Sequence, residues 1–310
     1  MPRRFVIDTD TASDDAVALV LALTEPSISV EAVTVVAGNV PLERGVQNAL
    51  YTREVCGSTT PVYAGAGEPV HGRGLVTGET VHGTDGMGDI GLPLGGREPD
   101  DGDAVGVLVE LAHSYPDELT LVTLGPLTNV ALALRKDPSI ARLYQRVVVM
   151  GGTGDHSGNM TPAAEFNIYV DPEAAAEVFA SGTALEMVGW DVSRKHAVLS
   201  PAEMESVRGT GRLGVFCMDI QAQLLRFCRE VTRVPGIDLP DPVAVAYAID
   251  PTIARSARRA FVAVETVGTH TRGMTVVDAL GLTGNEPNAL VVDAADHNRF
   301  VGMLHAAGAR

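Results

Sequence analysis

The chain has 310 residues, of which 45% are hydrophobic, and its formal net charge is −16. This length allows a large core, and the acidity excludes nucleic acid and anionic membrane as partners, because phosphate groups are bound by clustered Lys and Arg. Three scattered cysteines indicate no disulfide framework, no apolar run reaches the roughly 18 residues of a membrane span, and Asp8 comes too early for a signal peptide, so we expect a cytoplasmic protein.

The first predicted elements are a strand, a turn and a helix. Phe5-Val6-Ile7 is an apolar run typical of a buried strand, and residues 16–23 are rich in Ala and Leu and predict a helix. Thr11 or Ser13 is the expected N-cap of that helix. Between strand and helix, four carboxylates fall within eight residues: Asp8, Asp10, Asp14 and Asp15.

Carboxylates at this spacing repel one another unless something compensates. Like charges about 4 Å apart repel by roughly 4 kcal/mol per pair at an effective dielectric constant near 20. A hard cation with oxygen ligands, Ca²⁺ or Mg²⁺, is the simplest compensation. The alternative is that Asp14 and Asp15 only complement the helix dipole while Asp8 and Asp10 are solvated. We favour the cation, because a helix start rarely needs so many acids.

Strand and helix patterns then alternate to the end of the chain. We expect strands over 29–37, 61–64, 119–124, 146–150, 185–188, 261–267 and 290–292, and helices over 42–56, 103–113, 127–135, 172–180, 201–208, 212–230, 242–249 and 296–306. Repeated strand-then-helix units predict an α/β fold with an open, mostly parallel, Rossmann-like sheet and helices on both faces. Because no linker or charge run divides the chain, we expect a single domain over residues 1–310.

Polar residues follow three other predicted strands. Gly38-Asn39, Gly125-Pro126-Leu127-Thr128-Asn129 and Gly151-Gly152 each stand at a strand end, where a parallel sheet binds its ligands. Each alone is also an ordinary turn. Together with the acids at 8–15 they predict one polar site at the carboxyl edge of the sheet.

Two loops offer further candidates. Residues 65–96 hold eleven glycines, and a structureless stretch of this length is often functional. Its His82 either reaches over the site or lies in a surface loop. Residues 159–167 offer amides, a carboxylate and an aromatic ring, a set suited either to hydroxyl recognition or to a satisfied loop network.

Two motifs in the last third of the chain can also be explained as ordinary structural features. Asp241-Pro242 is either a helix start, with Asp as the N-cap and Pro as the first residue, or the source of a ligand. Gly209 to Gly214 matches G-x-G-x-x-G, but it follows a predicted helix rather than a strand. We therefore reject it as a dinucleotide site and expect a loop between two helices.

The segment Asp8-Thr9-Asp10-Thr11-Ala12-Ser13-Asp14-Asp15 resembles the amino-terminal signature of the inosine-uridine-preferring nucleoside hydrolases. The similarity covers nearly the whole chain. It includes, in order, Gly38-Asn39, His82-Gly83, Gly125 to Asn129, Met150-Gly151-Gly152, Asn159 to Asn167 and Asp241-Pro242. The resemblance implies a Ca²⁺-dependent hydrolase that splits ribonucleosides into free base and ribose in purine or pyrimidine salvage. It also implies a homodimer or homotetramer.

The resemblance further implies roles for individual residues. The metal ligands would be Asp10, Asp15, the backbone carbonyl of Leu124 and Asp241, with Asp10 also the general base on a Ca²⁺-bound water. The substrate-binding residues would be Asp14, Asn39, Met150, Asn159, Glu165, Phe166 and Asn167. This chemistry is coherent, because breaking a ribosyl C–N bond builds positive charge at C1′, which carboxylates and amide oxygens stabilise.

The sequence departs from the family pattern at two places. Thr11-Ala12 stands where Pro-Gly is usual, and Pro240 stands where many members carry a His, the usual acid for the departing base. The base must be protonated or must leave as an anion. His82 is our candidate for that acid. Other candidates are Trp190, Gln221, Gln223, Arg226 and Arg229.

Two other functions fit parts of the pattern. Asp8-Thr9-Asp10-Thr11 also matches the first motif of haloacid-dehalogenase-type phosphohydrolases, although neither of the two lysines, Lys136 and Lys195, has the context which that family needs. Alternatively, Pro240 marks a protein that binds a ribosyl ligand without cleaving it. Phosphate release with Mg²⁺ favours the first alternative, and tight nucleoside binding without turnover favours the second.

Overall fold

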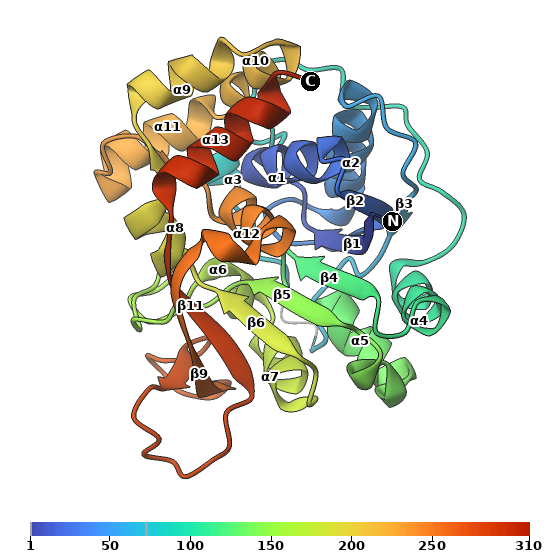
Figure 1. Ribbon diagram of the computed structural model, residues 1–310, viewed down its shortest axis with the longest axis vertical. Helices are drawn as coiled ribbons and strands as arrows, with labels where there is room; N and C mark the ends of the chain where they lie inside the picture. The colour runs from blue at the N-terminus through green and yellow to red at the C-terminus, as the bar shows by residue number, and fades with distance from the viewer. Residues whose placement is uncertain (1, 72–73) are drawn as a thin grey trace.

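A nine-stranded sheet forms the centre of the computed structural model, which describes residues 2–71 and 74–310. Its order is β10-β9-β11-β6-β5-β4-β1-β2-β3 (Figure 1). Its strands are β1 (Arg3–Thr9), β2 (Ile28–Val35), β3 (Val62–Ala64), β4 (Leu119–Thr123), β5 (Arg146–Met150), β6 (Leu185–Val188), β9 (Ala254–Val264), β10 (Thr275–Asp278) and β11 (Ala289–Ala295). Strand β9 is antiparallel to both of its neighbours, β10 and β11, and the other strand pairs are parallel. The predicted open, mostly parallel sheet is confirmed.

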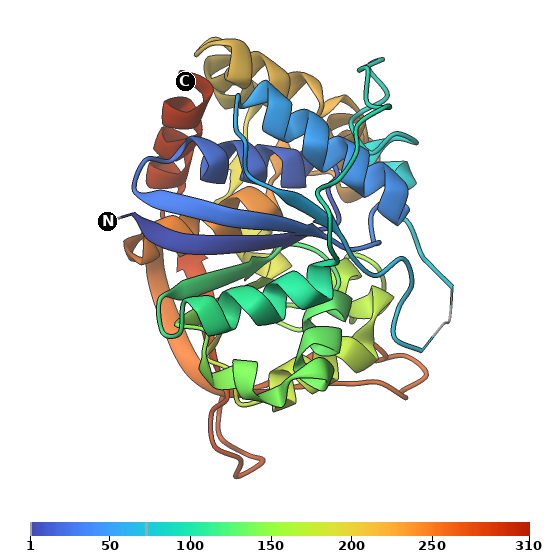
Figure 2. The same ribbon diagram turned by 90° about the vertical axis from the view of Figure 1, so that its right-hand side faces the viewer.

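Helices cover both faces of this sheet (Figures 1 and 2). One face packs against α1 (Ser13–Thr24), α2 (Leu42–Val55), α12 (Pro240–Ile249) and α13 (His297–Gly308). The other packs against α4 (Ala104–Ser114), α5 (Thr128–Lys136) and α7 (Pro172–Ala180). The remaining elements are α3 (Glu79–His82), α6 (Phe166–Val170), α8 (Trp190–His196), α9 (Pro201–Arg208), α10 (Arg212–Asp219), α11 (Ala222–Phe227), a small sheet of β7 (Val198–Leu199) and β8 (Ile237–Asp238), and the turns η1 (Pro138–Arg142), η2 (Cys228–Thr232) and η3 (Pro251–Ile253).

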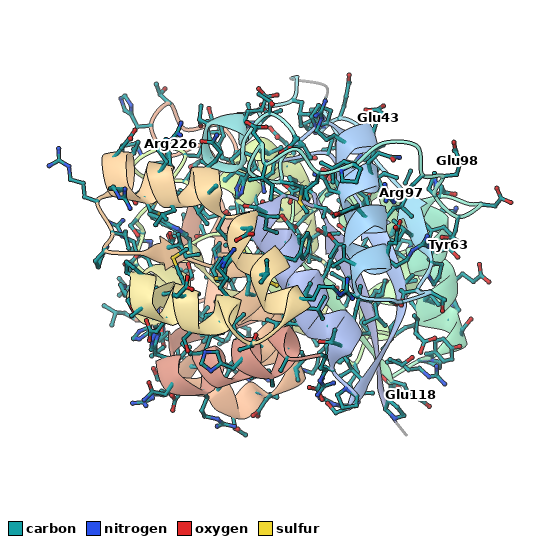
Figure 3. The ribbon with its side chains drawn as sticks, turned by 90° about the horizontal axis from the view of Figure 1, so that it is seen from above. Glu43, Tyr63, Arg97, Glu98, Glu118 and Arg226 are labelled. Carbon is teal, nitrogen blue, oxygen red and sulfur yellow. The ribbon has the colours of Figure 1, made fainter. Side chains whose placement is uncertain are left out.

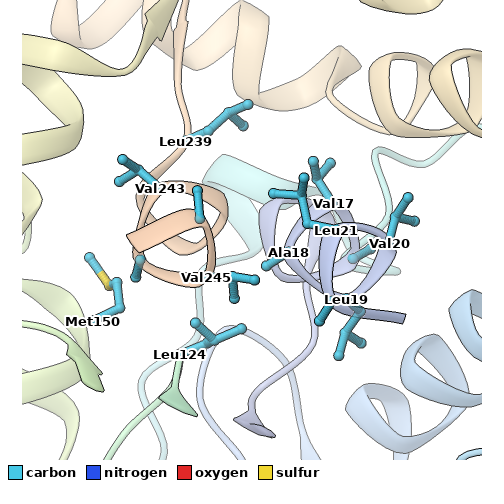
Figure 4. Close-up of a cluster of buried hydrophobic side chains, with 14 of the residues drawn as sticks. Val17, Ala18, Leu19, Val20, Leu21, Leu124, Met150, Leu239, Val243 and Val245 are labelled. Carbon is cyan, nitrogen blue, oxygen red and sulfur yellow. The ribbon is translucent and has the colours of Figure 1, made fainter. Parts of the chain in front are cut away.

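Burial on both faces explains the composition of β1. Phe5 and Ile7 point into the core under α1 and α12, and Val6 points into the core under α4 and α5, as side chains that alternate along a strand must. Helix α1 is buried on every side from Ser13 to Ala22. Figure 4 shows the side chains of α1 and α12 packed against each other above the ends of β4 and β5. This packing fixes the first turns of both helices relative to each other.

The predicted helix over 212–230 is wrong as a single element. It is divided into α10, α11 and the π-helical turn η2. The break has a side-chain cause: the Gln221 amide nitrogen donates to the carbonyl of Cys217, at 3.2 Å. The Gln221 backbone N–H bonds to Met218 instead, at 3.2 Å. A side chain that bonds to the i−4 carbonyl competes with the backbone N–H for it, which favours a break at this position.

Other boundaries also differ from the predictions. Strand β9 begins at Ala254, seven residues before the predicted 261, because its first half carries exposed arginines that mask a strand pattern. Neither β10, α6 and α8 nor the short elements α3, β7 and β8 were predicted from the sequence. The N-cap of α1 is Ala12, not Thr11 or Ser13. Helix α12 begins at Pro240, so Asp241 is not its N-cap. Gly209 to Gly211 joins α9 and α10, as expected.

Among the described residues, no helix has the length and apolar character needed to cross a bilayer.

Candidate active site

A cavity of about 500 Å³ opens at the carboxyl edge of the large sheet. This is an ordinary size for a small-molecule site. Most of the predicted site residues line it: Asp14, Asn39, His82, Leu124, Met150, Asn159, Glu165, Phe166, Asn167 and Asp241. The other two, Asp10 and Asp15, are fully buried. Asp8 and Asp10, both fully buried, are therefore not solvated as the alternative reading expected.

Three carboxylates from two distant parts of the chain converge beside the cavity. Oxygens of Asp14, Asp15 and Asp241 lie within 4.8 Å of one another, and all three residues are buried. Asp14 and Asp15 come from the first turn of α1, and Asp241 from the first turn of α12. The packing of α1 on α12 therefore assembles the cluster (Figure 4). Asp14, predicted as a ribose contact, stands within this cluster.

Asp10 lies against the backbone of two neighbouring strand ends. Its Oδ2 accepts the backbone N–H of Asn39 at 2.5 Å, whereas its Oδ1 is buried without a hydrogen-bond partner among the described residues. A Cβ on Gly38 would stand 2.1 Å from Asp10 Oδ2, and one on Gly125 would stand 3.0 Å from the Asp10 side chain. A side chain at either glycine would collide with Asp10, so glycine at both strand ends leaves room for this carboxylate.

Burial dominates the electrostatics of the acids. It raises the pKa of Asp14 and of Asp15 to about 6, with the Asp14 charge adding to the rise at Asp15. Burial, followed by neighbouring carboxylates, holds the pKa of Asp10 and of Asp241 well above the usual range. Asp14 Oδ1, like Asp10 Oδ1, has no hydrogen-bond partner among the described residues. An all-oxygen donor set with unsatisfied atoms fits a hard divalent cation.

The opposite wall of the cavity presents fixed polar groups. The Asn167 amide nitrogen donates to the carbonyl of Leu124 at 2.7 Å and to that of Met150 at 3.3 Å, which leaves its Oδ1 as an acceptor. Glu165 is the N-cap of α6 and accepts the backbone N–H groups of Asn167 and Gly152. Burial still raises the pKa of Glu165 to about 7. Asn159 is exposed at the rim, and its Oδ1 accepts the N–H of Phe166 at 2.9 Å.

His82 reaches over the site, as one of the two readings of its loop expected. Its Nδ1 lies 2.8 Å from Ser13 Oγ and 3.5 Å from Asp14 Oδ1. The Gln221 amide nitrogen donates to the carbonyls of Ser13 and Cys217, so its Oε1 must accept the Ser13 hydroxyl at 3.1 Å. Ser13 then has no proton for His82, and Nδ1 must carry the imidazole hydrogen. Burial lowers the pKa of His82 to about 4.

The far end of the cavity is walled by α8, α11, η2 and the start of α12. Apolar side chains of Leu224, Phe227 and Val231 lie there with Trp190 and Pro240. Gln221 does not line the cavity but supports His82 through Ser13. The other candidates on this helix, Gln223, Arg226 and Arg229, are not among the residues that line it. Figure 3 shows Arg226 at the periphery of the molecule.

Sequence reasoning missed three polar residues of this end: Asp238, Arg194 and Thr232. Asp238 is the partner of Trp190, whose indole N–H donates to Asp238 Oδ2 at 2.8 Å. The only signal for Asp238 was its position shortly before Asp241 at a predicted helix start. For Arg194 and Thr232 the sequence held no signal, because α8 and η2 follow no recognisable pattern.

Comparisons with known proteins identify the family of the chain. The sequence model for "Inosine-uridine preferring nucleoside hydrolase" matches residues 5–302. The chain belongs to this family. It is therefore a nucleoside N-ribohydrolase by family. It is 41% identical over 305 residues to a pyrimidine-specific ribonucleoside hydrolase of Salmonella agona and 40% identical to one of Citrobacter koseri, with 96% of each chain covered.

Solved structures of the family have the same fold. A plant nucleoside hydrolase superposes with a TM-score of 0.93 at 30% identity, covering 100% of this chain and 99% of its own. A purine-preferring ribonucleoside hydrolase from Gardnerella vaginalis superposes with a TM-score of 0.92 at 30% identity, covering 99% and 98%. Neither the phosphohydrolase nor the non-catalytic binder finds support in these comparisons.

Proposed function

We propose that the chain hydrolyses the N-glycosidic bond of ribonucleosides to free base and ribose, with Ca²⁺ held at the acid cluster. The convergence of Asp14, Asp15 and Asp241 carries this proposal. We propose Asp10, Asp15, Asp241 and the Leu124 carbonyl as protein ligands. When bound, a divalent cation supplies positive charge that makes a neighbouring water more acidic and fixes the ribose 2′- and 3′-hydroxyls.

Asp10 is the proposed general base. One of its oxygens is bonded to the N–H of Asn39, and the other, Oδ1, has no hydrogen-bond partner among the described residues. A general base must lie within hydrogen-bond reach of the proton it removes, and Oδ1 is the oxygen left for an attacking water. A divalent charge held beside Asp10 would oppose the rise in the pKa of Asp10 that burial causes, and so would favour the ionised form that a base needs.

The sugar is proposed to lie between the acid cluster and α6. Asp14, Asn39 and Asn167 would hold the 2′- and 3′-hydroxyls, Asn159 and Glu165 would face the 5′-hydroxyl, and Met150 and Phe166 would pack along the ring. The fixed amide of Asn167 supports this arrangement, because its Oδ1 can stabilise positive charge that develops on the sugar. Holding each hydroxyl orients C1′ for attack.

His82 is the proposed acid for the departing base. With Nδ1–H directed at Ser13, its Nε2 is the nitrogen that takes up a proton from solvent water and passes it to the base; the lowered pKa of His82 makes the protonated imidazole scarce at neutral pH but a strong acid. A His82→Asn variant should lose about 10²- to 10⁴-fold in kcat on uridine, the usual range for a general acid. It should lose far less on p-nitrophenyl β-D-riboside, whose leaving group departs without protonation. Equal losses on both substrates would remove His82 from this role.

The relatives suggest which base is preferred. Because the curated relatives at 40–41% identity are named pyrimidine-specific, we propose uridine and cytidine as the better substrates, in nucleoside salvage. We also propose a homodimer or homotetramer, which analytical ultracentrifugation tests.

A turnover screen tests the proposed function. Purine and pyrimidine ribonucleosides are incubated with the protein in Ca²⁺ and, in parallel, after chelation. We expect free base and ribose with Ca²⁺, loss of turnover on chelation, and recovery when Ca²⁺ is restored. Asp241→Asn should weaken Ca²⁺ binding, measured by calorimetry, as well as turnover. Full activity in chelator would refute the metal-dependent mechanism.

A further inference from the structure

The far end of the cavity holds a buried carboxylate that the cation and ribose chemistry does not use. Asp238 ends β8, is 7% exposed and lines the cavity. It lines the cavity together with Trp190, Leu224 and Phe227, and α11, which carries the last two, packs against α3, which ends at His82. Because His82 is the proposed acid for the departing base, this is the proposed leaving-group end. A buried carboxylate needs hydrogen-bond donors to be tolerated. Its donors therefore show how its oxygens are committed.

Each oxygen of Asp238 has one donor within the protein. Oδ2 accepts the indole N–H of Trp190 at 2.8 Å, and Oδ1 lies 3.5 Å from the thiol of Cys228, a weak donor. An ionised carboxylate offers about four acceptor sites. Acceptor capacity therefore remains on Asp238, and its exposed part is a portion of the cavity wall.

The side chains around Asp238 supply few competing donors. The Trp190 N–H is committed to Asp238, and the Thr232 hydroxyl donates to the carbonyl of Cys228 at 3.3 Å. Leu224 and Phe227 are apolar. Arg194 is exposed at the rim, with its guanidinium 4.9 Å from the centre of the Trp190 ring. This end therefore presents a fixed acceptor on a largely apolar wall, which suits a ligand that carries an N–H.

We propose that Asp238 is the specificity-determining residue for the base, accepting a hydrogen bond from a ring N–H or an exocyclic amine of the nucleobase, and that Trp190 is the positioning residue that holds it. This inference rests on the proposed hydrolase function. Uracil offers its N3–H and cytosine its 4-amino group. A site built to accept such a hydrogen bond rejects an analogue without the donor, because the buried acceptor is left unpaired.

The test compares matched pairs of nucleosides. Wild-type kcat/KM is measured for uridine against 3-methyluridine, and for cytidine against N4,N4-dimethylcytidine. We expect discrimination of at least about 100-fold in one pair. Asp238→Asn, which keeps an acceptor for Trp190, should reduce that ratio at least tenfold. Trp190→Phe, which removes only the indole N–H donor, should reduce it mainly by raising KM for the unmethylated nucleoside.

Asp219→Asn is the control, because Asp219 pairs with Arg208 on the outer helices and does not line the cavity; its ratio should equal that of wild type. Equal turnover of methylated and parent nucleosides by wild type, or an unchanged ratio in folded Asp238→Asn, overturns the inference. If the wild-type protein turns over neither the nucleosides nor p-nitrophenyl β-D-riboside, the hydrolase function is refuted instead. In that case dissociation constants of the same pairs decide the role of Asp238.

Discussion

The two oxygens of Asp10 have different surroundings, and this difference can be tested at a single residue. One oxygen is tied to the backbone of Asn39, and the other has no hydrogen-bond partner among the described residues. Asp10→Asn keeps the shape but removes the base, so kcat should fall by about 10²- to 10⁴-fold. Asp8→Asn is the matched control, because Asp8 is equally buried and also has one oxygen without a hydrogen-bond partner among the described residues, but its other oxygen accepts from Thr34 and Asn129 and not from Asn39, which lines the cavity. Similar losses in both variants would argue against a catalytic role for Asp10.

Gly38 provides a second test of the same carboxylate. In Gly38→Ala the new methyl group would meet Asp10 Oδ2 at 2.1 Å and Pro126 at 2.7 Å. Asp10 must move, so we expect a loss of at least tenfold in kcat/KM and a destabilisation of about 1–3 kcal/mol, as for other overpacked sites. Gly95→Ala, with open space around its Cβ, is the control. Activity and urea midpoints measured together decide the outcome.

At this scale the sequence was most informative where carboxylates and glycines stand at strand ends. Asp14, Asp15 and Asn39 lie at the carboxyl edge where the strand pattern placed them, because a parallel sheet brings its carboxyl ends together. Asp238 and Arg194 escaped prediction, because their roles depend on partners that only the folded chain brings near.

At the scale of elements, Gln221 joins two helices through one side chain. It lies at the break between α10 and α11, and its amide group bonds to Ser13, the first residue of α1. Gln221→Leu should cost about 1–3 kcal/mol in unfolding free energy, because buried carbonyls lose their donor. It should also free the Ser13 hydroxyl to donate to His82, so that the imidazole hydrogen moves to Nε2.

Two measurements check this prediction. Urea unfolding gives the stability change, and ¹⁵N NMR of the imidazole nitrogens gives the tautomer of His82. Gln223→Leu on the same helix is the control, because Gln223 is half-buried and does not line the cavity. An unchanged His82 tautomer in Gln221→Leu would contradict the hydrogen-bond order inferred here.

Elements with strong apolar periods could be predicted, and those defined by side-chain hydrogen bonds could not. The strands β1, β2, β4, β5 and β6 were found because both faces of the sheet are buried, which leaves nearly continuous apolar runs. The division of 212–230 depends on the Gln221 amide, and β9 hides behind its exposed arginines. Neither feature changes the apolar pattern on which the prediction rests.

For the whole molecule, the buried titratable groups predict how stability changes with pH. The pKa of Asp14 and of Asp15 is raised to about 6, and that of Asp8 and of Glu165 to about 7. An acid whose pKa is raised in the folded state contributes stability to the fold at pH values below its unfolded-state pKa. This contribution is lost as the pH rises through the folded-state pKa values of 6 to 7. The pKa of His82, lowered to about 4, acts oppositely, since its contribution is lost as pH falls from 6.5 toward 4.

Four acids outweigh one histidine, so the metal-free protein should become less stable between pH 5 and pH 8. Because the ionised acids are what a cation binds, Ca²⁺ should raise the Tm most at pH 8 and least at pH 5. Thermal unfolding at several pH values, with and without Ca²⁺, measures both effects. A Ca²⁺-induced rise in Tm that does not depend on pH would contradict this account.

The two ends of the cavity are built from different parts of the fold, and this division bears on how the chain can change over time. The end proposed for the sugar is made of strand termini and the first turns of α1 and α12, where most neighbours belong to the core. The end proposed for the base is made mainly of α8, α11, η2 and β8, outside the large sheet. A duplicated gene can therefore acquire a new base preference through a few substitutions there while inheriting bond cleavage intact. A mutational library confined to Trp190, Arg194, Phe227, Val231 and Asp238 is the place to select enzymes for modified nucleosides.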